Sequence, residues 1–243
     1  MTPEEVAAAT ALPIAMLGSK YYFSETTNAA LAEAGFSGLS GYVGGRGGVL
    51  GDVATDVVVS AFALFSPSFI EMGWTQTKEQ GAPTDAAAAF ADGLGRWAAE
   101  TFGHLDGLAD FAAAARAVFD ATNAMSQPLY AGWRAMPVPD DPAAATGLAL
   151  KILRELRFGF HIHGLSAVGM TPVEAVVAQL GPEQAQMFGW AGPFPDPEPL
   201  KPVHQQAEEI TTARMNEVYE AIDADQRTHI AATVKAIAEL ALG

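Results

Sequence analysis

Residues 85–101 read DAAAAFADGLGRWAAET and decide the fold class of this chain. Alanine has the highest helix propensity of the amino acids, and it fills most of the first half of this stretch. Phe90, Leu94 and Trp97 recur at intervals of four and three residues, which places them on one face of a helix with the acidic residues turned outward. The stretch therefore predicts an amphipathic α-helix and not a strand.

Four more alanine-rich windows predict further helices, at residues 4–17, 108–124, 143–156 and 204–241. No stretch alternates apolar and polar residues cleanly, and no Asn-Gly or Asp-Gly turn lies between β-branched runs. We therefore expect an all-α fold, a multi-helix globular bundle in which any sheet is a minor element.

Two proline-rich breaks divide the chain, MPVPDDP at residues 136–142 and GPFPDPEPLKP at residues 192–202. A helix cannot continue through either segment. We expect a helical N-terminal region over residues 1–138 and a C-terminal region over residues 139–243, packed as one compact unit. Thr171 and Asp223 are expected to start helices in the second region.

The composition argues against several classes of protein. The chain has 13 Lys and Arg against 28 Asp and Glu, and its formal net charge of −15 repels nucleic-acid phosphates and anionic membranes. It has no cysteine, which excludes disulfides, thiolate nucleophiles and zinc sites built on sulfur. The first residues, MTPEE, carry acids where a secretory signal carries Lys or Arg. We expect a cytoplasmic protein that binds neither nucleic acid nor a membrane.

Glycines concentrate in residues 35–51, GFSGLSGYVGGRGGVLG, around the single cation Arg46. The stretch lacks the Lys-Ser/Thr of a phosphate loop and has Leu50 where the dinucleotide fingerprint needs its third glycine. Glycines spaced four residues apart can let a helix approach its neighbour closely. Alternatively, Arg46 faces a cavity and holds a carboxylate in bidentate geometry, which belongs either to a ligand or to the protein itself.

Residues 153–165, LRELRFGFHIHGL, combine Glu155, Arg157, His161 and His163. In a helix the two histidines point to different sides and cannot bind one metal, whereas a break at the glycine before them would align both rings. Three hypotheses stay open: a structural pair of Glu155 with Arg157 or His161, a ligand-facing or catalytic His161, and a metal site of His161 and His163. Haem ligation by His161 is a further alternative, although no haem-attachment motif is present.

Aromatic residues gather at Tyr22-Phe23 and in residues 62–69, FALFSPSF. Such clusters are core by default, but ligand pockets are lined with the same residue types. Tyr22, Phe23 and Phe65 are therefore candidates to enclose a ligand. The serines at 66 and 68 lack a Gly-x-Ser-x-Gly elbow, so no hydrolase nucleophile is predicted.

A family resemblance is carried by five segments: YFS (22–24), ALAEAGF (30–36), GYVGGR (41–46), FALFSP (62–67) and LRELRFGFH (153–161). With these segments the chain resembles, over about two thirds of its length, a family of helix-turn-helix-like proteins from actinobacteria. The resemblance implies a helical N-terminal region, a degenerate winged helix like that of the MarR regulators, and a closing helical hairpin. It brings no activity. The positions it marks are Tyr22, Phe23, Arg46, Phe65, Glu155, Arg157 and His161.

The C-terminal region departs from a DNA-binding winged helix. Residues 192–202, where a wing would lie, contain no alternating strand pair. Residues 170–243 hold four Lys and Arg against eleven Asp and Glu, a net charge of −7, and the candidate recognition helix, residues 182–190, has no cation. A DNA-reading domain needs the opposite sign. We therefore take the helix-turn-helix resemblance as architectural.

The leading hypothesis is a small-molecule-binding protein with an apolar pocket, in which Arg46 and His161 are polar anchors and Tyr22, Phe23 and Phe65 are walls. The first alternative is an enzyme of small-metabolite, secondary metabolism with His161 as general base and Arg46 as electrostatic stabiliser. The second is a metal- or haem-binding protein acting through its two neighbouring histidines. The sequence identifies no particular cofactor.

Apolar residues in the last helices follow helical spacing. They are Met215, Val218, Ile222, Ile230, Val234 and Ile237. These side chains can either form a homodimer interface through the C-terminal helices or complete the core of a single chain.

Overall fold

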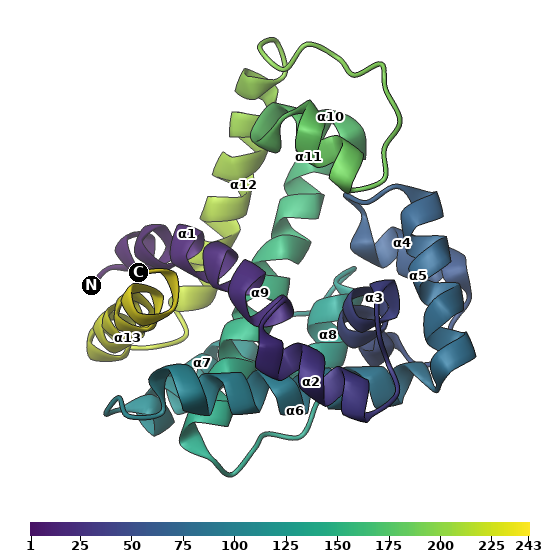
Figure 1. Ribbon diagram of the computed structural model, residues 1–243. Coiled ribbons are helices and arrows are strands. Elements are labelled where there is room, and N and C mark those ends of the chain that lie inside the picture. Colours follow the sequence, from purple (N-terminus) through teal and green to yellow (C-terminus); the bar gives the residue numbers. More distant parts are fainter.

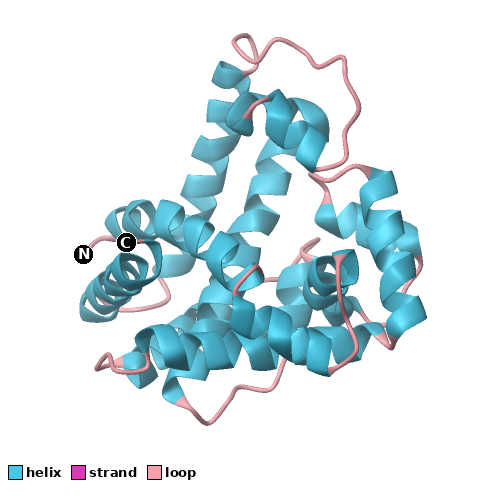
Figure 2. Cartoon of the chain, in the orientation of Figure 1, coloured by secondary structure: helices cyan, strands magenta, loops and turns pink.

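The structure is a computed structural model that describes residues 1–243. It contains thirteen α-helices, one 3₁₀ turn and no strand, which confirms the all-α prediction (Figures 1 and 2). The helices are α1 (Pro3–Tyr22), α2 (Glu25–Glu33), α3 (Leu39–Gly47), α4 (Thr55–Phe62), α5 (Pro67–Gln80), α6 (Pro83–Phe102), α7 (Leu108–Ala121), α8 (Pro128–Arg134), α9 (Pro142–Ala167), α10 (Pro172–Leu180), α11 (Pro182–Met187), α12 (Lys201–Tyr219) and α13 (Ala224–Leu242), and the 3₁₀ turn η1 (Gly48–Leu50) follows α3. None of the helices is long and apolar enough to span a bilayer.

The predicted helices are present, with changes at their ends. The last window splits into α12 and α13, and Asp223 caps α13 as expected. Thr171 caps α10 in a capping box with Glu174. α9 runs unbroken through Gly159. A Cβ at this position would lie 2.6 Å from the side chain of Gln127, so the glycine allows Gln127 to pack against the helix. His161 and His163 are therefore both on a helix.

The long helix α9 is the centre of the molecule (Figure 1). α6 and α7 pack against its N-terminal half and α12 against its C-terminal half, while α1 packs against both α12 and α13. The group formed by α3, α4 and α5 lies on the other side and contacts α6. Helices from both predicted regions therefore pack against each other. Through α1, the N-terminal end of the chain contacts the two C-terminal helices.

The interior contains one large apolar core, one smaller core and two clusters of three buried residues each. The large core has 38 buried residues, and the smaller one, between α3, α4, α5 and α8, has eight. The six apolar residues singled out in the closing helices all lie in the large core: Met215, Val218, Ile222, Ile230, Val234 and Ile237. These six side chains are buried within a single chain, so a dimer through α12 and α13 would have to use other residues of those helices.

The glycines of α3 and η1 allow very close packing. A Cβ at Gly44 would lie 2.6 Å from Cγ2 of Thr77 on α5, and a Cβ at Gly48 would lie 1.8 Å from the carbonyl oxygen of Pro83 at the start of α6. Real side chains do not fit at such distances, which confirms that the glycines serve close approach. As a result Arg46 of α3 enters the interior and is 1% exposed.

Replacing Gly48 with Ala forces the new methyl group against backbone atoms. We expect the free energy of unfolding to fall by about 2 to 3 kcal/mol, the upper range for overpacking a core. Urea denaturation followed by circular dichroism measures the change. Gly41→Ala is the matched control, since its Cβ would meet only Leu31 at an ordinary 3.4 Å. That variant should be unchanged or gain up to about 1 kcal/mol from helix propensity, and an equal loss in both variants would contradict the packing argument.

Candidate functional site

Four charged side chains meet inside the protein, and we call Arg46, Lys151, Arg154 and Glu155 the charge cluster. Arg46 donates to Glu155 through Nε and Nη2, both at 2.9 Å, in bidentate geometry. Lys151 donates to the same carboxylate from one turn earlier on α9, and Nη1 of Arg154 lies 3.4 Å from Oε1. Arg46, Lys151 and Glu155 are each at most 1% exposed. A single buried carboxylate thus faces three cations.

Aromatic rings cover two of these cations. The guanidinium of Arg46 lies between the rings of Phe62 and Phe158, 4.7 and 4.5 Å from their centroids. The ammonium of Lys151 lies 4.4 Å from the ring centroid of Trp133. Trp133 also donates its indole N–H to the backbone carbonyl of Arg46 at 3.0 Å. These rings exclude water while offering the cations their negative faces.

Tyr22 of α1 completes the surroundings of the carboxylate. Its hydroxyl donates to Oε1 of Glu155 at 3.0 Å, and the guanidinium of Arg154 lies 5.2 Å from its ring centroid. Burial and the neighbouring carboxylate raise the pKa of Tyr22 well above its usual value, so the hydroxyl remains a donor. The cluster therefore links α1, α3 and α9.

Burial and charge act in opposite directions on the ionisable groups. Burial alone would raise the pKa of Glu155, but Arg46 and Lys151 hold it well below its usual range. For Lys151 burial dominates over the attraction of Glu155, and its pKa is well below its ordinary value. Two guanidinium groups and the Lys151 side chain therefore face one carboxylate.

The expected pairing of Glu155 with Arg157 or His161 is wrong. Arg157 is two residues after Glu155 and His161 is six residues after it, and neither spacing places two side chains on the same face of a helix. Arg157 donates instead to Oε2 of Glu208 at 2.6 Å, and Nδ1 of His161 lies 3.3 Å from Oε1 of the same carboxylate. Glu208 is on α12, so this second carboxylate joins α9 to α12.

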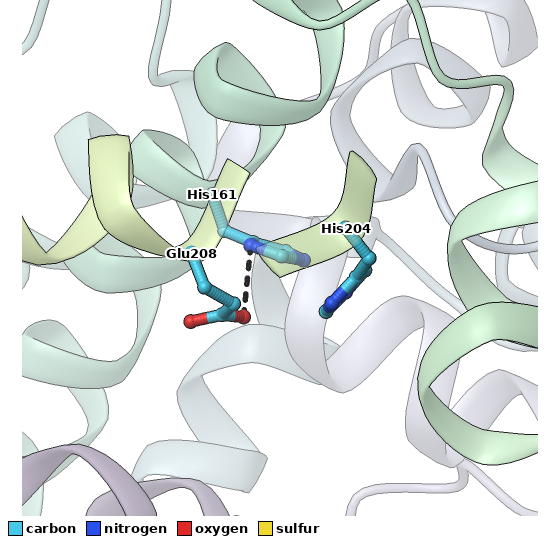
Figure 3. Close-up of side chains that lie close together, drawn as sticks. All are labelled: His161, His204 and Glu208. Atoms are coloured by element: carbon cyan, nitrogen blue, oxygen red, sulfur yellow. Dashed lines mark ion pairs between the residues drawn. The ribbon is translucent and has the colours of Figure 1, made fainter. Parts of the chain in front are cut away.

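Figure 3 shows His161, His204 and Glu208 pointing toward one another, and we call these three residues the histidine cluster. One ligand atom from each residue lies within 4.8 Å of the others, and the two imidazole rings are 5.3 Å apart. The Nε2 atoms of both histidines are buried without a hydrogen-bond partner. Burial lowers the pKa of His161 to about 4, against the opposing effect of Glu208, so the ring is neutral near pH 7.

The other predicted residues are placed apart. Phe65 is buried and stacks on Phe188, with 4.2 Å between the ring centroids, so it belongs to the smaller core. Phe23 is 63% exposed and stacks on Tyr42. His163 is not part of the histidine cluster, because two residues of helix turn it away from His161.

The two predicted polar anchors do not meet. Arg46 uses its guanidinium on Glu155, whereas His161 lies beside Glu208. The residues that sequence reasoning missed are Lys151, Arg154, His204 and Glu208. Lys151 with Glu155 and His204 with Glu208 both follow the i, i+4 spacing of predicted helices, and that spacing was the available signal.

A separate cavity of about 240 Å³ lies between α7 and α9. Its wall is mainly apolar, with Phe119, Leu148 and Ile152 among the lining residues, and it contains none of the predicted site residues. Two arginines line it: Arg116 is paired with Asp120 at 2.9 Å, and Nη1 of Arg134 donates to the backbone carbonyls of Phe119 and Thr122. Because the predicted site residues lie elsewhere, we place the candidate site at the buried charges.

Comparison with known protein families matches residues 7–192 to a helix-turn-helix family. The chain belongs to this helix-turn-helix family. The match runs from α1 past α11, so it includes the charge cluster and His161 but ends before α12, which carries the other two members of the histidine cluster. No curated protein and no solved structure matches the chain.

The C-terminal part of the family match contains two consecutive short helices, α10 and α11. They meet at Gly181, whose φ of 87° is the left-handed conformation that glycine adopts freely. α11 is only six residues long, and residues 192–202 contain no strand where a wing would lie. Residues 158–200 contain no Lys or Arg. The helix-turn-helix part of this family member therefore has no cationic helix.

Replacing Glu155 with Gln would leave Arg46 and Lys151 buried without a counter-charge. We expect the free energy of unfolding to fall by about 3 to 5 kcal/mol, the usual cost of removing one partner of a buried ion pair. Urea denaturation measures it. Asp92→Asn is the control, because it removes an exposed pair with Arg96 whose side chains are 55% and 45% exposed and should cost less than about 1 kcal/mol. Equal effects would show that the charge cluster does not stabilise the fold.

Proposed function

We propose that this protein is a cytoplasmic binder of a small organic anion with an apolar or aromatic body, and that Arg154 at the edge of the charge cluster receives the anionic group. The observation that carries the proposal is the excess of positive charge beside Glu155, in a chain whose net charge is −15. Buried charges are normally paired, because an unpaired charge in a low-dielectric interior is costly. A ligand anion would supply the missing counter-charge.

Arg154 is the accessible member of the cluster. Its side chain is 25% exposed, whereas those of Arg46 and Lys151 are sealed. A guanidinium has five N–H donors, and Arg154 makes one long contact of 3.4 Å to Glu155, while its Nε has no partner. Because its Nε is buried, the terminal N–H groups are the ones that a carboxylate could reach, and a carboxylate can bind a guanidinium in bidentate geometry.

Aromatic surface next to Arg154 suits an apolar ligand body. The Arg154 guanidinium and the ring of Phe23 both contact Tyr22, at 5.2 and 6.4 Å between centres. Phe23 is exposed and stacks on Tyr42. Phe23 and Tyr42 offer apolar surface on which a ligand body could pack. The proposal therefore keeps Phe23 as a ligand contact, with the buried Tyr22 next to it, and moves the polar anchor from Arg46 to Arg154.

The alternatives remain predictions. An enzyme with His161 as base and Arg46 as stabiliser would need both groups at one substrate, and they contact different carboxylates. A DNA-binding role follows from the family description alone, and the negative charge of residues 170–243 opposes it. The finer likeness to MarR winged helices, an actinobacterial source and a homodimer also stay predictions.

Arg154→Gln tests the ligand site. We expect a panel of indole-3-acetate, 3-phenylpropionate and decanoate, each with its neutral amide, to contain an acid that binds and an amide that does not. The variant should lose about 10- to 100-fold in affinity for that acid, the worth of a charge-assisted hydrogen bond. Thermal shift identifies the acid, and isothermal titration calorimetry gives the dissociation constant.

Arg116→Gln is the matched control, since Arg116 lines the separate cavity between α7 and α9. It should bind the same acid as tightly as the unaltered protein. A loss of binding in Arg116→Gln instead of Arg154→Gln would move the site to that cavity. Equal affinity for acid and amide would show that charge does not anchor the ligand and would reject the proposal.

Binding to duplex DNA is expected to be absent. At about 150 mM salt, fluorescence anisotropy of a labelled duplex should show no saturation with protein, because a net charge of −15 repels the phosphates. Binding that weakens as salt increases would reveal phosphate contacts and would restore the DNA-binding alternative.

A further inference from the structure

We propose that His161, His204 and Glu208 form a binding site for one divalent transition-metal ion of the zinc class. The site uses residues other than the proposed anion site, so the two proposals stand independently. Its ligands come from two helices: His161 from α9, and His204 and Glu208 from α12. The arrangement is visible in Figure 3.

The secondary structure presents the three side chains together. His204 and Glu208 are four residues apart on α12 and share one face of that helix. That face packs directly against α9, where Gly164 allows close approach: a Cβ at Gly164 would lie 2.6 Å from the carbonyl oxygen of Ala207. This close approach places His161 against the same face.

The distances are those of a nearly formed metal site. Nδ1 of His161 is 3.3 Å from Oε1 of Glu208, which is about the separation of two ligands around a tetrahedral ion with bonds of about 2.0 to 2.1 Å. All three ligand atoms lie within 4.8 Å of one another.

An unpaired nitrogen is the second observation that points to a ligand. Nε2 of His204 is buried without a partner, in a residue that is 8% exposed. Buried polar atoms are nearly always hydrogen-bonded, and leaving one unpaired costs about 1 to 3 kcal/mol. A metal ion held by Nε2 of His204, Nδ1 of His161 and Oε1 of Glu208 would give this atom a partner.

The carboxylate is held ready for this role. Arg157 donates to Oε2 of Glu208 at 2.6 Å, which leaves Oε1 directed toward His161. Hydrogen bonds of this kind to a ligating carboxylate fix its orientation. Arg157 is therefore a positioning residue for Glu208 and not itself a ligand.

The donor set defines the chemical class of the ion. Two imidazoles and one carboxylate suit zinc and related ions, whereas calcium and magnesium prefer oxygen ligands only. Three protein ligands leave the fourth tetrahedral position open to water or to an exogenous ligand. This ligand set differs from a His161–His163 pair, because His163 is turned away by the continuous helix.

The test uses zinc and cobalt(II) with the full-length, metal-stripped protein. We expect one Zn²⁺ per chain by isothermal titration calorimetry and native mass spectrometry, unaffected by millimolar magnesium. Cobalt(II) should give the intense visible absorption of a tetrahedral N/O site. His204→Ala should weaken zinc binding by at least about 100-fold, since even outer-shell changes cost about 10- to 100-fold, and should lose the cobalt spectrum.

His163→Ala is the matched control, a histidine on the same helix with an Nε2 that is also buried and unpaired. It should bind zinc like the unaltered protein. His204 makes no hydrogen bond through Nε2, so His204→Ala should stay folded, and circular dichroism checks this. Should that variant unfold, Glu208→Gln is measured in its place, with the same loss expected.

Four results would overturn the proposal. The first is no zinc binding by the unaltered protein, and the second is unchanged binding after His204→Ala or Glu208→Gln. The third is a loss of binding in His163→Ala alone, which would assign the metal to the other histidine pair. Displacement of zinc by millimolar magnesium would show a surface carboxylate site and would also contradict it.

Discussion

The Glu155 carboxylate accepts hydrogen bonds from Tyr22 of α1, from Arg46 of α3 and from Lys151 on its own helix. A buried charge is stable only when its partners are in place, so this one group fixes three helices that are far apart in the sequence. The two apolar cores supply most of the driving force for compaction. The carboxylate adds specificity, because α3 and α9 must pack in the one register that brings the Arg46 guanidinium to Glu155.

α9 positions both clusters. Glu155 and His161 are six residues apart, about 9 Å along the helix axis, and they turn toward different neighbours. Glu155 meets α3, whereas His161 meets α12. α9 therefore contributes residues to both the charge cluster and the histidine cluster. α3 completes the first, and α12 completes the second.

Much of the fold was predictable, because alanine content, apolar spacing and capping residues are local signals. Asp223 and Thr171 start helices as expected, and the glycines around Arg46 serve close packing. The site was less predictable, since ion pairs depend on which helix faces align in three dimensions. Arg46 and Glu155 were both identified, yet their pairing across 109 residues has no local signal. His204 was missed because its partner His161 lies on another helix.

The distance in sequence between Arg46 and its partner has a consequence for biosynthesis. Glycine is a poor helix former, so α3 gains little from its own propensity and depends on tertiary contacts. On the ribosome, Arg46 emerges 109 residues ahead of Glu155. The nascent N-terminal half must keep this cation in water until α9 has been translated. A chain that stalls before α9 therefore cannot acquire its native interior.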